Sequence, residues 1–254
     1  MQGVSIIIPT YRRPDYLKRL LDSIEEQTYR NFEVIVIDDH SENQSVYKEV
    51  IGQYKNKFSL YYESNSQNMG APYSRNRGID LAKYDYIALV DDDDEWTKDK
   101  LEEQLKSFSN SKIGISYTWA DAIGEQGMEI YCYRANISGN AKKEILKECF
   151  IPSSSVMVTK KAICAAGKFD EKFPACQDWD MWTRIIFRGY EVAVVKQVLM
   201  IYHKHSGATI GKSPRAKKGF QYYYKKHIMK FIREFMFSGE SRLILHALKR
   251  GITG

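Results

Sequence analysis

The sequence contains no uninterrupted apolar run of about 18 residues, the length that a membrane-spanning helix requires. The apolar run at 4–9 is too short for a secretory signal peptide, and Arg12 and Arg13 follow it directly. The chain has only four cysteines, and none of them stands in a CxxC spacing, which argues against a zinc site or a disulfide framework. We therefore expect a cytoplasmic protein with reduced thiols.

Two glycine-rich nucleotide-binding motifs are also absent. No GxGxxG follows the apolar run at 4–9, and GxxxxGK[ST] occurs nowhere in the chain. These absences argue against a dinucleotide-binding Rossmann enzyme and against a P-loop NTPase. A phosphate group bound by this protein must therefore be held in another way.

Basic residues are concentrated at the C-terminal end. The whole chain carries a formal net charge of +6, but residues 212–254 carry +9, which leaves −3 for residues 1–211. Aromatic, apolar and Lys residues mix at loosely helical spacing over 219–237. This composition is typical of a helix that lies on an anionic membrane surface. It would equally suit a helix that packs on the rest of the protein or on another subunit.

Short β-branched runs alternate with segments of helical periodicity in the first half. Strands are predicted at 4–9, 32–39, 58–63 and 86–90, and helices at 14–24, 46–54, 71–83 and 101–108. This alternation predicts an α/β protein with a parallel sheet covered by helices on both faces. Beyond about residue 112 the alternation weakens, with strands predicted at 114–122, 155–159 and 190–202 and a helix at 178–188.

Polar side chains follow three of the predicted strands where each strand ends. Thr10 follows the first, Asp38 and Asp39 the second, and four consecutive aspartates at 91–94 the fourth. Ligands of open α/β sheets bind outside the carboxyl ends of the strands, so these groups could converge on one site. Clustered carboxylates repel one another unless a cation lies among them, and a hard divalent cation can bridge carboxylate and diphosphate. The alternative is a solvated acidic turn.

Five segments, in this order, resemble elements of the family 2 glycosyltransferases of the GT-A fold. They are VSIIIPTYRRPDYLKRLLDSIEEQTYRNFEVIVIDDHS (4–41), NMGAPYSRNRGI (68–79), YIALVDDDDEWTKDKL (86–101), IPSSSVMVTKKAICAAGKFDE (151–171) and CQDWDMWTR (176–184). Each element alone is a weak signal, but five in the family's order are a strong one. With YHKHSGATI (202–210), the resemblance spans about residues 4–205.

The resemblance implies a GT-A fold, which is a nucleotide-binding, mostly parallel sheet flanked by helices. Residues 1–211 would form the catalytic domain, with a donor half at about 1–95 and an acceptor half at about 96–211. Residues 212–254 would be a basic, aromatic, helical tail outside the family resemblance.

The resemblance also implies an activity. An inverting hexosyl- or N-acetylhexosaminyltransferase would move a sugar from a nucleotide-diphosphate sugar, most often UDP-linked, to a saccharide or lipid-linked saccharide in cell-surface polysaccharide synthesis. Such acceptors are often at the cytoplasmic membrane face, where the tail could hold the enzyme peripherally. The QxxRW element of processive synthases is absent, which favours single additions. No nucleic-acid partner is expected, and an oligomer is possible.

Seven residues match the positions that bind the donor in this family. They are Pro9, Thr10, Tyr11, Asp39, Arg75, Asp91 and Asp92. The first three would border the base, and Asp39 would accept a hydrogen bond from uracil, whereas Asp38 could merely fix the turn. Arg75 would face the base or the diphosphate, for which a guanidinium is well suited. Asp91 or Asp92 would approach the ribose.

The resemblance makes Asp93 and His205 ligands of Mn²⁺ or Mg²⁺. Alternation of side chains would put Asp91 and Asp93 on one side of the backbone, with the remaining acids of 91–94 facing water. His203 stands where the family has an arginine.

Asp178 matches the general base that takes the proton of the acceptor hydroxyl. Gln177 stands where the family has a glutamate. Asp180 is the competing carboxylate, but it lies about 200° further round the same helix, so both cannot face one substrate.

Two other functions share some of these features. A sugar-nucleotide nucleotidyltransferase would need a glycine-rich loop after the first strand, where this chain has PTYRRP. A non-catalytic binding protein that acts through the basic tail would leave the acidic strand ends without a role.

Overall fold

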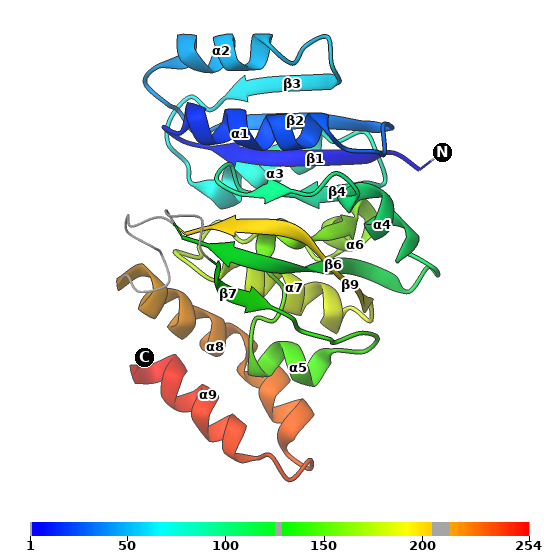
Figure 1. Cartoon of the computed structure of the whole chain (residues 1–254). Helices are drawn as coiled ribbons and strands as arrows, with labels where there is room; N and C mark the ends of the chain where they lie inside the picture. The colour runs from blue at the N-terminus through cyan, green and yellow to red at the C-terminus, as the bar shows by residue number, and fades with distance from the viewer. Residues whose placement is uncertain (1, 125–128, 205–213, 254) are drawn as a thin grey trace.

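The computed structural model describes residues 2–124, 129–204 and 214–253. Its first half alternates strand and helix as predicted (Figure 1). The elements are β1 (Val4–Thr10), α1 (Pro14–Glu25), β2 (Phe32–Asp38), α2 (Gln44–Gly52), β3 (Ser59–Ser64), α3 (Ala71–Leu81) and β4 (Tyr86–Leu89). β1 and β2 are buried along their whole length, which explains their continuous apolar, β-branched sequences.

The second half is less regular. Its elements are β5 (Glu95–Trp96), α4 (Lys100–Lys106), β6 (Ile113–Ile123), β7 (Glu129–Tyr133), α5 (Lys142–Lys147), the 3-10 turn η1 (Ser153–Ser155), β8 (Met157–Thr159), α6 (Lys160–Ala165), α7 (Gln177–Phe187) and β9 (Glu191–His203). The short strands β5, β7 and β8 pair in antiparallel fashion, which accounts for the loss of the strand–helix alternation in the sequence.

One sheet runs through both halves. Its strand order is β3-β2-β1-β4-β8-β6-β9-β5, with β7 paired to β6. Most paired residues lie in the parallel ladders β1–β2, β2–β3, β1–β4 and β6–β9, which confirms the predicted α/β, mostly parallel sheet flanked by helices. In this register Thr10 lies opposite Asp38, so the carboxyl ends of β1 and β2 are adjacent.

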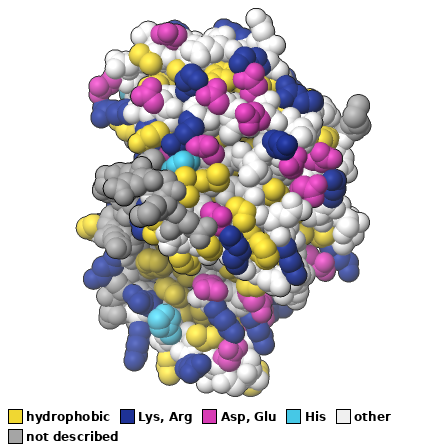
Figure 2. All heavy atoms as spheres, viewed as in Figure 1, with side chains coloured by type: hydrophobic (Ala, Val, Ile, Leu, Met, Phe, Trp, Pro, Cys, Tyr) yellow, Lys and Arg dark blue, Asp and Glu magenta, His cyan; other side chains and the backbone are white. Residues whose placement is uncertain are grey.

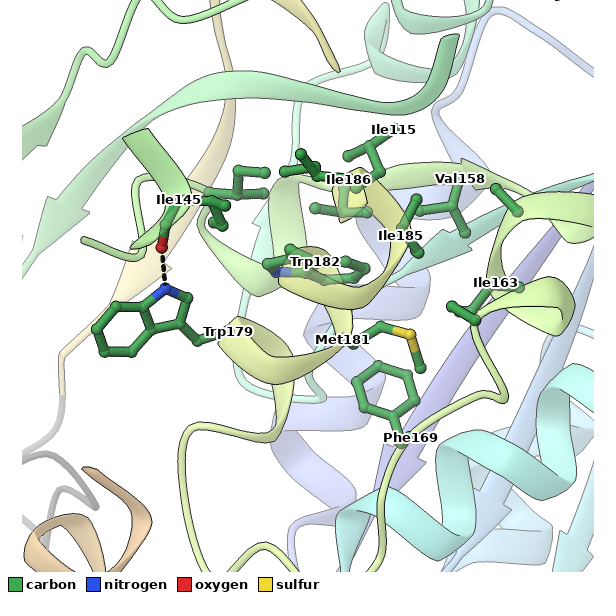
Figure 3. Packing of buried hydrophobic residues seen from close by; sticks show 14 of the residues in the cluster. Ile115, Ile145, Val158, Ile163, Phe169, Trp179, Met181, Trp182, Ile185 and Ile186 are labelled. Carbon is green, nitrogen blue, oxygen red and sulfur yellow. Dashed lines mark hydrogen bonds between the residues drawn. The ribbon is translucent and has the colours of Figure 1, made fainter. Parts of the chain in front are cut away.

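Two hydrophobic cores lie on the two faces of the sheet. One includes residues of α1, α2 and α4, and the other includes residues of α3, α5, α6 and α7. Trp182 is fully buried in the second core, where it lies near Ile115, Ile185 and Ile186 (Figure 3). Trp182 is therefore a packing residue and is inaccessible to a ligand.

The basic tail forms two helices, α8 (Pro214–Phe235) and α9 (Arg242–Thr253), at the opposite end of the molecule from α2 (Figure 1). Tyr223, Phe231 and Phe235 of α8 belong to the same core as α7. Tyr223 stacks on Trp179 of α7 with ring centroids 3.9 Å apart. Of the alternatives that the sequence left open for the tail, packing on the rest of the protein is therefore present. None of the helices in the described parts of the chain has the length and apolarity needed to cross a membrane.

Candidate active site

The polar strand ends converge as the sequence predicted. The Thr10 hydroxyl, at the end of β1, donates a hydrogen bond to Asp92 Oδ2 at 2.7 Å. Arg13, directly before α1, reaches the same acidic turn, with Nη1 2.5 Å from Asp93 Oδ2 and 3.4 Å from Asp92 Oδ1. The sequence reasoning did not propose Arg13 for the site, although its position after β1 is a usable signal. Arg12 instead pairs with Glu42.

The four aspartates at 91–94 form a turn in which the Asp94 N–H donates to the Asp91 carbonyl at 3.2 Å. Asp92 and Asp94 are only 5% and 1% exposed, so the expectation that the remaining acids face water is wrong. The turn directs these two side chains into the protein. The Asp92 side chain lies against Thr10 at the end of β1. Burial raises the pKa of Asp92 to about 7 and raises that of Asp94 well above its usual range. Asp91 and Asp93 remain more accessible.

Arg75 lies on α3 and is buried, with 4% exposure. Its guanidinium pairs with Asp91 and lies over the Phe169 ring, 5.5 Å from the ring centroid. Within the described residues, Nε and Nη1 of Arg75 have no hydrogen-bond partner. Buried N–H groups without acceptors are costly, and this cost is larger when the group is charged. The position therefore favours an additional anionic ligand.

The two aspartates that end β2 have different surroundings. Asp38 accepts hydrogen bonds from the backbone and hydroxyl of Ser41 and from the hydroxyls of Tyr62 and Ser64, so it fixes the turn. Asp39 accepts from the side chain of Asn65 at 2.8 Å.

Asp39 also accepts from the backbone N–H groups of Met69 and Gly70, at 2.8 and 2.7 Å. A carboxylate offers about four lone-pair positions, so these three hydrogen bonds leave Asp39 capacity for one more donor. Pro9 is buried in β1, whereas Tyr11, just beyond the strand, exposes 36% of its surface at the same edge of the sheet.

Asp178 is the second residue of α7 and is partly exposed. It accepts a hydrogen bond from the Trp179 backbone N–H at 2.8 Å. Burial raises its pKa, Arg75 opposes this rise, and the negative charge of Asp91 adds to it. Asp178 therefore lies within electrostatic reach of the Arg75–Asp91 pair.

An open pocket of about 380 Å³ borders Asp178. Its lining residues come from α7 and the residue before it, from the end of α5 and the segment that follows, and from α8. They are Lys147, Glu148, Cys149, Cys176, Asp178, Trp179, Phe220 and Tyr224. The Trp179 indole N–H donates to the Ile145 carbonyl, which fixes this side of the pocket (Figure 3).

Asp180, the competing carboxylate, is fully buried and has three nitrogen partners. Arg184 Nε lies 2.8 Å, Lys226 Nζ 3.0 Å and His227 Nε2 2.8 Å from its oxygens. Burial opposes ionisation of Asp180, but the hydrogen bond from His227 and the charge of Arg184 outweigh it and lower the pKa to about 2. Asp180 therefore anchors α8 to α7. No sequence motif marks His227 as a partner of Asp180, and only its position in the basic tail could have drawn attention to it.

His205 lies outside the described residues. Within the described residues, no group of three or more His, Cys, Asp or Glu side chains is arranged to hold a metal ion. His203 pairs with Glu95 at 2.7 Å. The oxygen donors of Asp91 and Asp93 are nevertheless of the type that Mg²⁺ and Mn²⁺ prefer, and such ions need few protein ligands when a diphosphate supplies the others.

The fold, together with the acidic turn beyond β4, is that of a GT-A-type glycosyltransferase. The chain belongs to glycosyl transferase family 2, whose family model matches residues 5–161. It is 31% identical over 209 residues to the amylovoran biosynthesis glycosyltransferase AmsB of Erwinia amylovora, a match that covers 78% of this chain and 69% of AmsB.

Two solved structures are similar in fold. Residues 1–349 of S. aureus TarS, in complex with UDP-GlcNAc, give a TM-score of 0.78 at 18% identity, over 98% of this chain and 72% of that one. The mannosyltransferase PcManGT of Pyrobaculum calidifontis, in complex with GDP-Man and Mn²⁺, gives a TM-score of 0.67 at 18% identity, over 98% of this chain and 70% of that one.

The two carboxylates of α7 should differ in their effect on stability. Asp180→Asn removes the buried carboxylate that Arg184, Lys226 and His227 contact, although Lys226 keeps its pairing with Asp170, so we expect a loss of about 3–5 kcal/mol in the free energy of unfolding. Asp178→Asn removes a carboxylate whose charged form burial disfavours, so we expect little change or a small gain at pH 7. Urea denaturation of both variants measures the difference, and equal losses would contradict the assignment of Asp180 as the structural acid.

Proposed function

We propose that this protein is an inverting, metal-dependent glycosyltransferase that moves a hexosyl or N-acetylhexosaminyl group from a nucleotide-diphosphate sugar, preferably UDP-linked, to a saccharide or lipid-linked saccharide. The observation that carries the proposal is the placement of Asp178, a carboxylate with a raised pKa, within electrostatic reach of the buried Arg75 and its partner Asp91. Membership of family 2 argues against the two alternative functions considered from the sequence.

The donor would bind along the carboxyl ends of β1, β2 and β4. Pro9, Thr10 and Tyr11 would border the base, with the exposed Tyr11 ring as the stacking surface. Asp39, with capacity for one more donor, would accept from the uracil N–H.

The ribose would lie between the base and the acidic turn. Asp91 is the better candidate to contact it, because Asp92 is buried and bonded to Thr10. The free Nε and Nη1 of Arg75 would bind the diphosphate, to which a guanidinium can donate two parallel hydrogen bonds. The UDP-GlcNAc complex of TarS supports a UDP-linked donor. Because PcManGT binds GDP-Man, GDP-sugars should be tested as donors as well.

Asp93 would hold Mn²⁺ or Mg²⁺, with His205 as a further candidate ligand. Asp93 is partly accessible, and its present partner Arg13 is a half-exposed side chain that can move aside. A bound divalent cation would stabilise the negative charge that develops on the departing diphosphate. The Mn²⁺ in the PcManGT complex supports this proposal.

Asp178 would act as the general base. The acceptor hydroxyl oxygen attacks the anomeric carbon while the bond from that carbon to the diphosphate breaks on the opposite face, and Asp178 takes the hydroxyl proton. A raised pKa brings a carboxylate closer to the operating pH, which makes it a more effective base. One displacement with one base inverts the anomeric configuration.

The first kinetic prediction concerns this base. Asp178→Asn keeps the size of the side chain and removes its basicity, so we expect the transfer rate to fall by about 10²–10⁴-fold. UDP affinity should change little. Because the pKa of Asp178 is raised, the acidic limb of the wild-type rate profile should lie above the range of an ordinary carboxylate, with the rate rising as pH increases through it.

Before that experiment, the donor must be identified by screening the purified protein for hydrolysis of UDP-, GDP- and dTDP-sugars. Asp180→Asn serves as the comparison at a temperature where that variant is folded. If it abolishes transfer while Asp178→Asn does not, the base has been assigned to the wrong carboxylate.

The second kinetic prediction concerns the metal. Asp93→Ala should abolish turnover and remove the dependence of UDP affinity on Mn²⁺, because it removes the proposed protein ligand. Calorimetric titration of UDP with and without Mn²⁺ measures this. Full wild-type activity in excess EDTA would rule out the metal-dependent mechanism.

The proposal extends to the acceptor and to the location of the protein. The similarity to AmsB, which is named for amylovoran biosynthesis, supports a role in cell-surface polysaccharide synthesis. Acceptors of this kind are often lipid-linked at the cytoplasmic membrane face, so we propose that residues 212–254 bring the enzyme to that surface. The tail carries a net charge of +9.

Exposed apolar side chains on α8, α9 and the connection between them support this location. Phe237 is 94% exposed, Met229 70% and Leu245 62%. Figure 2 shows Lys and Arg side chains with hydrophobic ones between them toward this end of the molecule. This pattern suits an anionic surface, where apolar groups insert and cations face the head groups.

Vesicle binding tests the membrane proposal. Deletion of residues 214–254 would remove Tyr223 and Phe231 from the core, so point variants are the better probes. The wild type should co-sediment with vesicles that contain phosphatidylglycerol, less so at high salt because exposed charges are screened over roughly 8–10 Å. Phe237→Ser should weaken this binding without changing the melting temperature. Equal binding to neutral phosphatidylcholine vesicles, or none to either, would count against the proposal.

A further inference from the structure

The tail supplies part of the pocket beside the proposed base. Phe220 and Tyr224 of α8 line this pocket together with Asp178 and Trp179 of α7. The family match ends at residue 161, so the α8 side of the pocket belongs to a part of the chain that the family model does not describe.

A glycine allows α8 to lie this close to the base. A Cβ built on Gly219 would lie 2.7 Å from the Ala175 carbonyl oxygen and 2.9 Å from the Ala175 Cβ, distances that real contacts do not allow. Glycine within a helix costs about 1 kcal/mol relative to alanine, so a packing requirement accounts for its use here. The approach brings α8 against the segment that precedes α7 and seats Phe220 next to Trp179.

The aromatic side chains of the pocket differ in accessibility. Trp179 and Tyr224 are 4% and 7% exposed, whereas Phe220 is 36% exposed. The Phe220 ring lies edge-on to Trp179, with centroids 6.1 Å apart and an interplanar angle of 79°. Phe220 is therefore the ring of this group that offers free surface to a ligand, and it contacts Trp179, which Tyr224 contacts in turn.

The pocket combines this apolar wall with carboxylates. Asp178 and Glu148 line the same space of about 380 Å³, which is within the usual range for small-molecule sites. A sugar ring has the matching chemistry, because its C–H face packs on an aromatic ring while its hydroxyl groups donate hydrogen bonds to carboxylates. A purely apolar chain would leave both carboxylates unsatisfied on contact.

We propose that Phe220, supported by Trp179 and Tyr224, forms the subsite for the acceptor's terminal sugar and orients its hydroxyl toward Asp178. The C-terminal helix α8 is then an element of acceptor recognition as well as of packing. This inference rests on the proposed function and assigns its acceptor class, a saccharide whose apolar ring face is free to stack.

The test measures the binding of four probes, the methyl glycosides of glucose, galactose, mannose and N-acetylglucosamine. Saturation-transfer NMR in the presence of UDP and Mg²⁺ should detect at least one of them on the wild type. Phe220→Ala should weaken that binding about tenfold, the size of effect typical of a lost stacking contact. Phe220→Tyr, which keeps the ring, should retain it, and UDP affinity should be the same in all three proteins.

Tyr222→Ala is the matched control, because Tyr222 lies on the same helix with 37% exposure but packs on Phe173 outside the pocket. It should bind the glycoside as the wild type does. Gly219→Ala, which displaces α8 from Ala175, should weaken glycoside binding while UDP binding persists.

Three results would overturn the inference. The first is that none of the four glycosides binds to the wild type. The second is that Phe220→Ala binds the glycoside as tightly as the wild type does. The third is that Tyr222→Ala weakens glycoside binding as much as Phe220→Ala does. Failure of the proposed function would look different, because the wild type would then neither bind UDP nor hydrolyse any nucleotide sugar.

Discussion

The ion pair between the buried Arg75 and the more accessible Asp91 is the interaction on which the site depends. It joins α3 to the acidic turn beyond β4, and it leaves two guanidinium nitrogens without a partner among the described residues. A buried arginine in this state is stable only because Asp91 supplies one counter-charge, and it has capacity for a further anion. Its charge also reaches Asp178, where it moderates the rise in pKa that burial produces. An anionic ligand that binds Arg75 would offset this charge and so raise the pKa of Asp178, the proposed base.

The acceptor side of the site depends on a second charged cluster. Asp180 binds Arg184 on its own helix and Lys226 and His227 on α8. These contacts hold the tail against α7 two residues beyond Asp178, the proposed base. Tyr223, stacked on Trp179, extends this contact. Segments 40 or more residues apart in the sequence thus form one rigid support. The tail consequently serves the catalytic body directly, and an additional role at a membrane would use the opposite, exposed side chains such as Phe237.

The sequence predicted the alternation of strands and helices and the convergence of Thr10 and the acidic turn, because both follow from local periodicity and from the rule for strand ends. It did not predict the burial of Asp92 and Asp94, since that depends on how a turn is oriented against neighbouring strands. Asp91 and Asp93 are the more accessible pair and Asp92 and Asp94 the buried pair, but a turn produces this pattern, whereas the prediction assumed an extended backbone. The partners of Asp180 on α8 were also beyond prediction, because no local pattern links α7 to residues 46 or 47 positions later.

The central claim is that Arg75 binds the diphosphate of the donor and thereby couples donor and acceptor sites. Calorimetric titration of UDP into the wild type and Arg75→Lys, both with Mn²⁺ present, tests it most directly. Lysine keeps the charge near Asp91 but loses the planar, paired donors. The account predicts that UDP affinity falls by about tenfold or more, the effect of losing one charge-assisted hydrogen bond, while the variant still melts cooperatively. Equal UDP affinity in the two proteins would contradict it.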